Sequence, residues 1–299
     1  MIRIHVSART TSALREKVVN PLAQTLCRSL ASWPKIRPRR VRVISMDVTG
    51  TMVSFSGKLE DHYAEAARRC GVSGISAVSD RISGSFNDAY EETCERYPCF
   101  GGSRITAKNW WRQCVARSFE LAGVQMTQGE EERVFQRVYS TFGSHAAYKA
   151  FPDAMPFLRW ARRNGIACGV LSNADERYGD SILPMLGLVD GLSFLCFSKD
   201  LGFQKPDPRA FSGVMEAADP WLPRGAVEHE DVLPSDILHI GNDYRKDFEG
   251  ARRSGMHAVL LDRYDESEQA DEWRRRGAPV FKDLLDVVEF LGRSGTRLG

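Results

Sequence analysis

The sequence predicts an α/β protein with a doubly wound, Rossmann-like parallel sheet into which a helical domain is inserted. Three observations support this prediction. Five short apolar runs alternate with helical patterns between residues 41 and 292. The long stretch after the first run has helical periodicity throughout. Polar residues with chemical potential follow the ends of the apolar runs, which is where an open parallel sheet binds its ligands.

The five apolar runs are rich in Val, Ile and Leu and are bounded by turn residues, as buried parallel strands are. They are VRVISM (41–46), IACGVL (166–171), LSFLCF (192–197), ILHI (237–240) and AVLL (258–261). The patterns MPFLRWARRNG and FEGARRSGM between them have the length of crossover helices and contain Asn-Gly and Ser-Gly stops. The segment GAPVFKDLLDVVEFLGR predicts a final short strand and helix.

The segment between the first two strands is too long for one crossover, because about 120 residues separate them where about thirty suffice. Its apolar pattern is helical in HYAEAARRCG, FNDAYEETCERY, TAKNWWRQCVARSFELAG and GEEERVFQRVYSTFG. We therefore predict an all-helical cap over 53–150, inserted into a core of 41–52 and 151–292 with a tail at 293–299. The proline-rich residues 219–235 predict a surface loop.

The N-terminal segment differs in charge from the rest of the chain. Residues 1–42 hold ten Lys and Arg and one acid, Glu16, whereas residues 43–299 hold 31 basic and 38 acidic residues. This Arg-rich, Ser-rich segment with an apolar residue every four positions resembles a mitochondrial transit peptide. A disordered arm and an arm that binds nucleic acid or an acidic partner are the alternatives. We predict a transit-peptide-like or anchoring extension over 1–40 and a mitochondrial location, otherwise a cytoplasmic one.

Composition excludes several classes of protein. No run of about twenty apolar residues occurs, so the sequence predicts no membrane-spanning helix. The seven cysteines include no CxxC pair and no Cys/His cluster at metal spacing. The sequence therefore argues against a disulfide framework and against a structural zinc site, and it predicts reduced, mostly buried thiols.

Clusters of polar residues follow four of the predicted strands. In chain order they are Asp47-Val48-Thr49-Gly50-Thr51, Ser172-Asn173, Lys205-Pro206-Asp207-Pro208 and Gly241-Asn242-Asp243-Tyr244-Arg245-Lys246-Asp247. A single cluster is weak support, since KPDP alone also suits the start of a helix. All four in this order, each at the end of a strand, are strong support. We expect them to meet in one crevice at the carboxyl edge of the sheet.

The four clusters resemble the signature motifs of the haloacid dehalogenase (HAD) superfamily of hydrolases, and the resemblance covers residues 41–292. The segments KNWWRQCVARSFELAGVQ and GVLSNADERYGDSILPMLGL resemble the subgroup of haloacid dehalogenase-like hydrolase domain-containing protein 3. The resemblance implies a Rossmann-like HAD core with a cap. It also implies a Mg²⁺-dependent phosphohydrolase that acts on a small phosphorylated metabolite through an aspartyl-phosphate.

The same resemblance assigns roles to individual residues. Asp47 attacks phosphorus, Lys205 stabilises the nucleophile and the developing charge, and Thr49 occupies the position of the acid/base. The candidates for phosphate binding are Thr51, Ser172, Asn173 and Lys205. The candidates for Mg²⁺ binding are Asp47, the backbone carbonyl of Thr49, Asn242, Asp243 and Asp247.

Two positions depart from the family pattern. Thr49 stands where the phosphatases of the superfamily have the aspartate that protonates the leaving group and then activates water. Threonine cannot relay a proton at neutral pH, and acid-base help is worth about 10² to 10⁴ in rate. Asn242 stands where a metal-binding aspartate is usual, so it offers an oxygen without the charge. We therefore predict slow or impaired catalysis, weak Mg²⁺ binding and a preference for good leaving groups.

The same departures fit a second function. A HAD fold that has lost its chemistry serves as a scaffold or assembly factor, for instance in a mitochondrial ribonucleoprotein such as an assembling ribosome. Residues 1–42 would then anchor it to RNA. Sedimentation with a large RNase-sensitive particle supports the scaffold, and a free monomer supports the enzyme.

Overall fold

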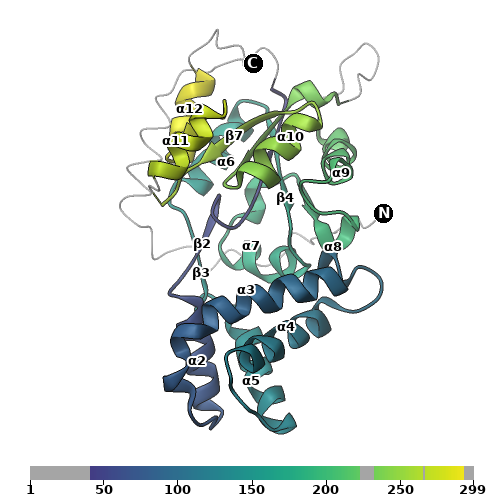
Figure 1. The fold of residues 1–299 in the computed structure, drawn as a ribbon. Helices are drawn as coiled ribbons and strands as arrows, with labels where there is room; N and C mark the ends of the chain where they lie inside the picture. Colours follow the sequence, from purple (N-terminus) through teal and green to yellow (C-terminus); the bar gives the residue numbers. More distant parts are fainter. Residues whose placement is uncertain (1–40, 223–231, 265–266, 293–299) are drawn as a thin grey trace, which may run out of the picture.

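The computed structural model describes residues 41–222, 232–264 and 267–292, and it has the predicted α/β core with a helical cap (Figure 1). The core sheet has six strands in the order β5-β4-β1-β6-β7-β8, and all neighbouring strands are parallel. The strands are β1 (Val43–Met46), β4 (Ala167–Ser172), β5 (Phe194–Phe197), β6 (Ile237–Gly241), β7 (His257–Leu261) and β8 (Val280–Phe281). The strand order reverses at β1, which places a ligand site at its carboxyl end.

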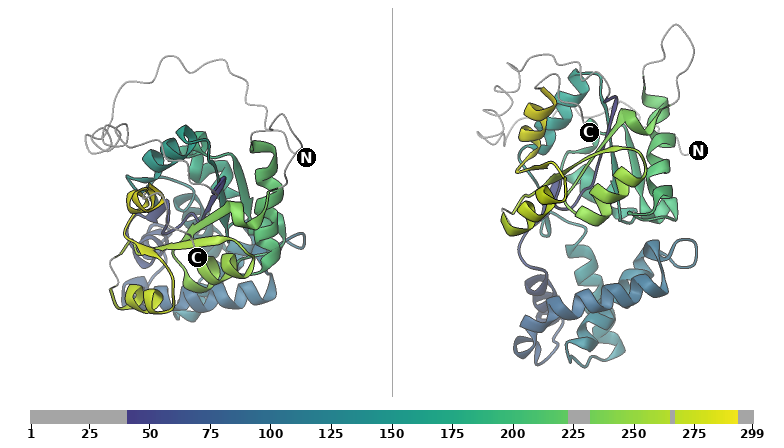
Figure 2. Two further views of the ribbon diagram at one scale, coloured as in Figure 1. Left: turned by 90° about the horizontal axis from the view of Figure 1, so that it is seen from above. Right: turned by 45° about the horizontal axis from the view of Figure 1, so that its top comes forward.

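Helices cover both faces of the sheet, as Figure 2 shows from two sides. Ile44 and Met46 of β1 share a core with α6 (Ala154–Arg163) and α12 (Leu284–Gly292). Val43 instead shares a core with α9 (Pro208–Ala218) and α10 (Gly250–Arg253) on the opposite face. All four residues of β1 are fully buried. This two-sided burial explains why three of the four residues of the central strand are apolar.

The cap consists of four main helices with an apolar core of their own, and it forms a separate layer beside the sheet (Figure 1). The helices are α2 (Leu59–Arg69), α3 (Ser79–Arg96), α4 (Ala107–Leu121) and α5 (Gln128–Thr141). Their starts follow from the sequence. Thr106 caps α4 by accepting a hydrogen bond from the amide of Asn109, and Thr127 forms a capping box with Glu130 at α5.

A two-stranded ribbon joins the cap to the core, and the sequence did not predict it. It pairs β2 (Val53–Phe55) with β3 (Tyr148–Ala150) in antiparallel register. The amide of Phe151 continues the pairing by donating to the carbonyl of Met52 at 2.9 Å. Strands of three residues are too short to show alternation in the sequence. Both connections between cap and core therefore run side by side.

The sequence predicted no membrane-spanning helix, and it predicted reduced, mostly buried thiols. No helix in the part of the chain that the structure describes is long and apolar enough to cross a membrane. The described cysteines, at positions 70, 94, 99, 114, 168 and 196, are free thiols and most are buried. The predicted extension over 1–40 and the tail at 293–299 lie outside the described residues.

Candidate active site

Three charged side chains meet at the carboxyl end of β1. The amide of Asp47 donates to the carbonyl of Ile240 at 2.9 Å, which fixes Asp47 at the edge of the sheet. The Nζ of Lys205 donates to Asp47 Oδ1 at 2.8 Å and to Asp247 Oδ1 at 2.6 Å. The side chains of Lys205 and Asp247 are each 2% exposed, whereas that of Asp47 is 14% exposed. Within this charged group (Asp47, Lys205, Asp247), Asp47 is the member that reaches solvent.

Asn173 holds the backbone of Lys205 in place. Its Oδ1 accepts a hydrogen bond from the Lys205 amide at 2.7 Å, and its Nδ2 donates to the Lys205 carbonyl at 3.0 Å. The two contacts join the loop after β4 to the loop that carries Lys205. Burial opposes the charge on Lys205, but Asp247 and Asp47 outweigh it and raise the pKa of the ammonium. Lys205 is therefore a fixed cation beside the nucleophile position.

Asp247 is held by four hydrogen-bond donors. Its Oδ1 accepts from Lys205 and from His239 Nε2, the latter at 3.1 Å. Its Oδ2 accepts from the amides of Asn242 and Asp243 at 3.0 and 2.9 Å. Burial disfavours its charge, but Lys205 and His239 prevail and hold the pKa of this carboxyl well below its ordinary range. Because each of its carboxylate oxygens accepts two hydrogen bonds, Asp247 is a fixed anion that orients Lys205.

His239 extends this network into the sheet. It is fully buried on β6, and its Nδ1 lies 2.8 Å from Ser45 Oγ on β1. Because Nε2 faces the carboxylate of Asp247, the ring donates from Nε2 and accepts the Ser45 hydroxyl at Nδ1. Burial lowers the pKa of His239, which keeps the ring neutral. The buried His239 thus links the charged group to Ser45 of the central strand by hydrogen bonds.

A different arrangement surrounds Thr49. Its Oγ1 lies 2.9 Å from the phenolic oxygen of Tyr178, on the helical turn η3 (Tyr178–Ile182). Burial raises the pKa of Tyr178, so its phenol is neutral. Thr49 and Asp47 are partly exposed, whereas Val48 and Gly50 beside them are buried. Thr49 and Tyr178 therefore form a pair of neutral hydroxyls next to the nucleophile position, which we call the hydroxyl pair.

Asn242 packs on the loop that carries Asp47. A Cβ at Gly50 would lie 2.2 Å from Asn242 Nδ2, and Gly50 also has a φ of 81°. Only glycine combines a positive φ with the missing Cβ that this close contact requires. The carboxylate of Asp243 is turned to Lys246, accepting from its amide at 2.7 Å and pairing with its Nζ at 3.2 Å. The loops after β1 and β6 thus converge as predicted from the sequence.

Comparisons with known proteins show the family to which this chain belongs. Residues 41–255 match the family model of the haloacid dehalogenase-like hydrolases. The chain belongs to this family. It is 31% identical to the haloacid dehalogenase-like hydrolase domain-containing protein 3 of Mus musculus over 85% of this chain and 96% of that protein. It is 28% identical to the Bos taurus protein of the same name over 87% of this chain and 98% of that protein.

Solved structures show the same fold at lower identity. A HAD phosphatase from Thermococcus onnurineus aligns with a TM-score of 0.54 at 18% identity, covering 84% of this chain and 98% of its own. L-2-haloacid dehalogenase from Xanthobacter autotrophicus with bound chloropropionic acid aligns with a TM-score of 0.57 at 15% identity, covering 85% and 100%. The two neighbours have different activities, so the fold alone does not define the reaction.

The oxygen atoms left around Asp47 in this HAD-like hydrolase determine which metal fits. Asp247 and Asp243 are engaged with nitrogen donors, so the loops after β1 and β6 offer Asp47, the Thr49 carbonyl and the Asn242 amide. Among the described residues, no group of three or more His, Cys, Asp or Glu is arranged to hold a metal. Oxygen ligands with one charge among them are the kind that Mg²⁺ prefers to softer metals, and binding of Mg²⁺ by this set stays a prediction.

Thr51 and Ser172, the other phosphate-binding candidates, lie deeper. Thr51 is fully buried, and its hydroxyl has no hydrogen-bond partner within the described part of the chain. Its carbonyl accepts from Arg263 Nη2, and Arg263 Nη1 pairs with Asp153 at 2.7 Å. Arg263 thus fastens both ends of the cap insertion to the core. Ser172 is 5% exposed at the end of β4. Phosphate binding by both residues stays a prediction.

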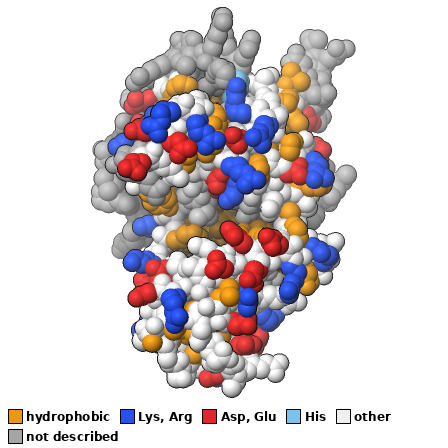
Figure 3. All heavy atoms as spheres, in the orientation of Figure 1, with side chains coloured by type: hydrophobic (Ala, Val, Ile, Leu, Met, Phe, Trp, Pro, Cys, Tyr) orange, Lys and Arg blue, Asp and Glu red, His pale blue; other side chains and the backbone are white. Residues whose placement is uncertain are grey.

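The cap closes onto the core through a second set of contacts. Trp111 Nε1 of α4 donates to Asp175 Oδ2, in the loop after β4. Arg177 pairs with Asp175 at 3.0 Å, and its guanidinium lies 5.0 Å from the Trp111 ring and 4.4 Å from the Tyr139 ring. Lys199 donates to the carbonyl of Ile105 at 2.9 Å. In Figure 3, hydrophobic side chains lie in the hollowed band between the two parts, with charged side chains above and below it.

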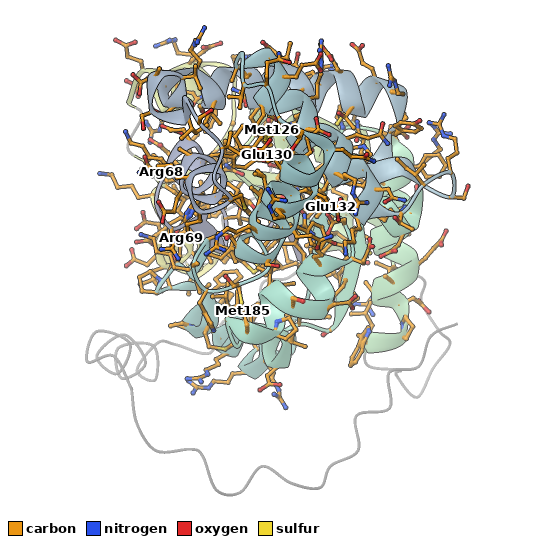
Figure 4. The ribbon with its side chains drawn as sticks, turned by 90° about the horizontal axis from the view of Figure 1, so that it is seen from below. Arg68, Arg69, Met126, Glu130, Glu132 and Met185 are labelled. Carbon is orange, nitrogen blue, oxygen red and sulfur yellow. The ribbon has the colours of Figure 1, made fainter. Side chains whose placement is uncertain are left out.

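Two grooves lie on the cap, away from Asp47. One, of about 620 Å³, runs between α3 and α4. The other, of about 850 Å³, lies between α2 and α5, and Figure 4 shows Arg69 and Glu132 on these two helices. Arg69 and Glu132 are each engaged in an ion pair, with Glu65 and Arg112 respectively. Two of the charged residues that line this groove are thus paired within the cap.

Proposed function

We propose that this chain is a Mg²⁺-dependent phosphohydrolase that acts on a small phosphorylated metabolite through an aspartyl-phosphate on Asp47. The observation that supports the proposal best is the charged group. A partly exposed carboxylate lies 2.8 Å from a buried ammonium, which a second, saturated carboxylate holds in place. The name of a relative adds support, since the phosphoserine phosphatase of Thermus thermophilus is 27% identical over 75% of this chain and 89% of its own.

The chemistry follows from these positions. The free oxygen of Asp47 attacks phosphorus, the bond from phosphorus to the leaving oxygen breaks, and the leaving oxygen keeps the electron pair. Lys205 holds the other Asp47 oxygen and offsets the charge that develops on the phosphoryl group. Water then attacks the phosphoryl group and releases phosphate and Asp47. When bound by Asp47, the Thr49 carbonyl and Asn242, Mg²⁺ supplies positive charge beside the phosphoryl oxygens.

Thr49 makes both steps slow in this proposal. No carboxylate accompanies Thr49 in the hydroxyl pair to protonate the leaving oxygen or to activate water. The rate lost is about 10² to 10⁴ relative to an enzyme that has this acid/base. Compounds whose leaving groups are stable as anions suffer least, so acyl phosphates and aryl phosphates are the favoured classes of substrate.

The test is Mg²⁺-dependent release of phosphate from a broad panel of phosphorylated metabolites, with the wild type and Thr49→Asp compared. We expect slow release by the wild type and a gain of about 10² with Thr49→Asp on poor leaving groups. Asn242→Asp is the matched variant, because it adds a carboxylate that tightens Mg²⁺ binding without supplying the acid/base. Silence of the wild type and of Thr49→Asp on every substrate contradicts the proposal.

The scaffold function stays a second candidate because of the charge contrast between residues 1–42 and the rest of the chain. In this proposal the basic segment binds RNA in a mitochondrial ribonucleoprotein. We expect the native protein to sediment with a large particle that RNase disperses. Sedimentation as a free monomer in a mitochondrial or cytosolic extract contradicts it.

A further inference from the structure

Tyr178 is the residue near Asp47 to which the sequence motifs assign no role. It lies 129 positions after Thr49, and its phenolic oxygen is 2.9 Å from the Thr49 hydroxyl. It belongs to the core rather than the cap, since η3 follows the loop that carries Ser172 and Asn173. The contact with Thr49 is therefore made between two loops of the core.

The ring of Tyr178 is held on two sides. Its centroid is 6.0 Å from that of Tyr148 on β3, at an interplanar angle of 70°. Its centroid is 6.5 Å from that of Phe197 at the end of β5. Aromatic neighbours in this geometry restrict rotation of the side chain, so the phenolic oxygen has a fixed position opposite Thr49.

The Tyr178 hydroxyl has two hydroxyl partners, Thr49 and Tyr148, so the direction of these hydrogen bonds decides where the Thr49 hydrogen points. If Thr49 donates to Tyr178, the Thr49 hydrogen is used within the protein. If Tyr178 donates to Thr49, the Thr49 hydrogen is free to point into the site. A phenol is a better donor than an alcohol, and a hydrogen bond donated by the Tyr148 hydroxyl to the Tyr178 oxygen leaves the Tyr178 hydrogen for Thr49. The second arrangement is therefore favoured.

We infer that Tyr178 is a positioning residue that directs the Thr49 hydroxyl as a hydrogen-bond donor to the oxygen of the leaving group. The inference rests on the proposed function. As the bond between phosphorus and the leaving oxygen breaks, the oxygen keeps the electron pair and Thr49 stabilises its charge without transferring a proton. The proton that completes the product comes from water. Such help matters most when the leaving group is a poor one, because more charge then develops on its oxygen.

The experiment uses the full chain with Mg²⁺ and two probes, nitrophenyl phosphate and phenyl phosphate, whose leaving groups differ in acidity. We expect Tyr178→Phe to lower kcat for phenyl phosphate by about tenfold and for nitrophenyl phosphate by less than about twofold, with KM unchanged. Tyr139→Phe is the control, since it removes a phenolic hydroxyl near Arg177 and keeps the ring that Arg177 contacts.

A second comparison isolates the pair. In a Thr49→Val background, Tyr178→Phe is expected to have no further effect, whereas Thr49→Ser keeps the preference of the wild type. The role of Tyr178 is overturned if Tyr178→Phe lowers kcat equally for both esters, or if it behaves as the wild type does. In either case, release of phosphate by the wild type still supports the proposed function. A wild type that releases phosphate from neither ester, in an assay where Thr49→Asp is also silent, overturns both.

Discussion

The charged group and the hydroxyl pair lie on the two sides of one short loop, and they differ in kind. The charged group joins two carboxylates and an ammonium at 2.6 and 2.8 Å, with His239 and backbone amides around them. The hydroxyl pair joins two neutral groups at 2.9 Å between aromatic rings. The charged group thus offers a carboxylate beside a fixed cation, whereas the hydroxyl pair contains no carboxylate.

This difference has a physical consequence. Buried charges are stable only as a set, because removal of one leaves another without a partner. Neutral hydroxyls carry no such constraint and cost little to change. We therefore expect substitutions of the two buried members, Lys205 and Asp247, to affect both folding and activity, and substitutions of Asp47 or of the hydroxyl pair to affect mainly activity.

The largest effect is expected from Asp47→Asn. The amide cannot form the aspartyl-phosphate, so phosphate release should fall by about 10³ or more. The free energy of unfolding should change little, since Asp47 is the exposed member of the charged group. Phosphate release and denaturant unfolding measure the two effects. Activity that survives in Asp47→Asn would show that another residue is the nucleophile.

Lys205→Met tests the mutual dependence of the charges. It leaves two carboxylates without their cation in a buried site, and we expect a loss of about 3 to 5 kcal/mol in the free energy of unfolding. Lys199→Met is the matched control, because Lys199 donates to neutral carbonyl groups instead. Its expected cost is about 1 kcal/mol per hydrogen bond lost. Equal losses of unfolding free energy in the two variants, measured with urea, would contradict the mutual dependence of the buried charges.

The pH dependence of stability reports on Asp247. Its pKa is lower in the folded chain than in the unfolded chain, so the unfolded chain binds more protons as the pH falls below about 5. The stability from Asp247 is complete above that pH and is lost in acid. We expect Asp247→Asn to flatten the fall in unfolding free energy between about pH 5 and pH 3 by up to 1.4 kcal/mol per unit. Asp271→Asn, which removes an exposed carboxylate outside the charged group, is the control, and equal flattening in both variants would contradict the prediction.

The smallest effect is expected from Asp175→Asn, which lies outside both groups. It keeps an acceptor for Trp111 but removes the charge that pairs with Arg177 at 3.0 Å. We expect a loss of about 1 to 2 kcal/mol, seen as faster proteolysis at the junction of cap and core. Asp180→Asn, an exposed carboxylate nearby in the sequence, is the control. Unchanged proteolysis would show that apolar contacts alone hold the cap.

The sequence predicted the sheet and the convergence of the motifs because both depend on local patterns. Apolar runs give the strands, and the edge of a parallel sheet is where their carboxyl ends meet. The resemblance to the haloacid dehalogenase superfamily implied that Lys205 serves Asp47, and the two side chains are in contact at 2.8 Å. The position of Asn173 at the end of a strand was predicted, but its two hydrogen bonds with the backbone of Lys205 were not.

Contacts between distant side chains were not predictable. Thr49 meets Tyr178 across 129 positions, and His239 meets Ser45 across 194. No periodicity or spacing marks such pairs, because they depend on how elements pack rather than on which elements form. Trp111 is similar, because its donated hydrogen bond to Asp175 joins residues 64 positions apart. The strands β2 and β3 were missed because each has only three residues.

The ribbon of β2 and β3 brings the two ends of the cap insertion together, so the cap could be exchanged for another domain. The chain leaves the core at Met52 and returns at Phe151, whose amide bonds to the Met52 carbonyl at 2.9 Å. Two ends so close can be joined by a very short linker or grafted onto another insert. A cap from a relative could thus be transplanted without moving Asp47 or Lys205, and the range of accepted molecules would change while the reaction stayed the same.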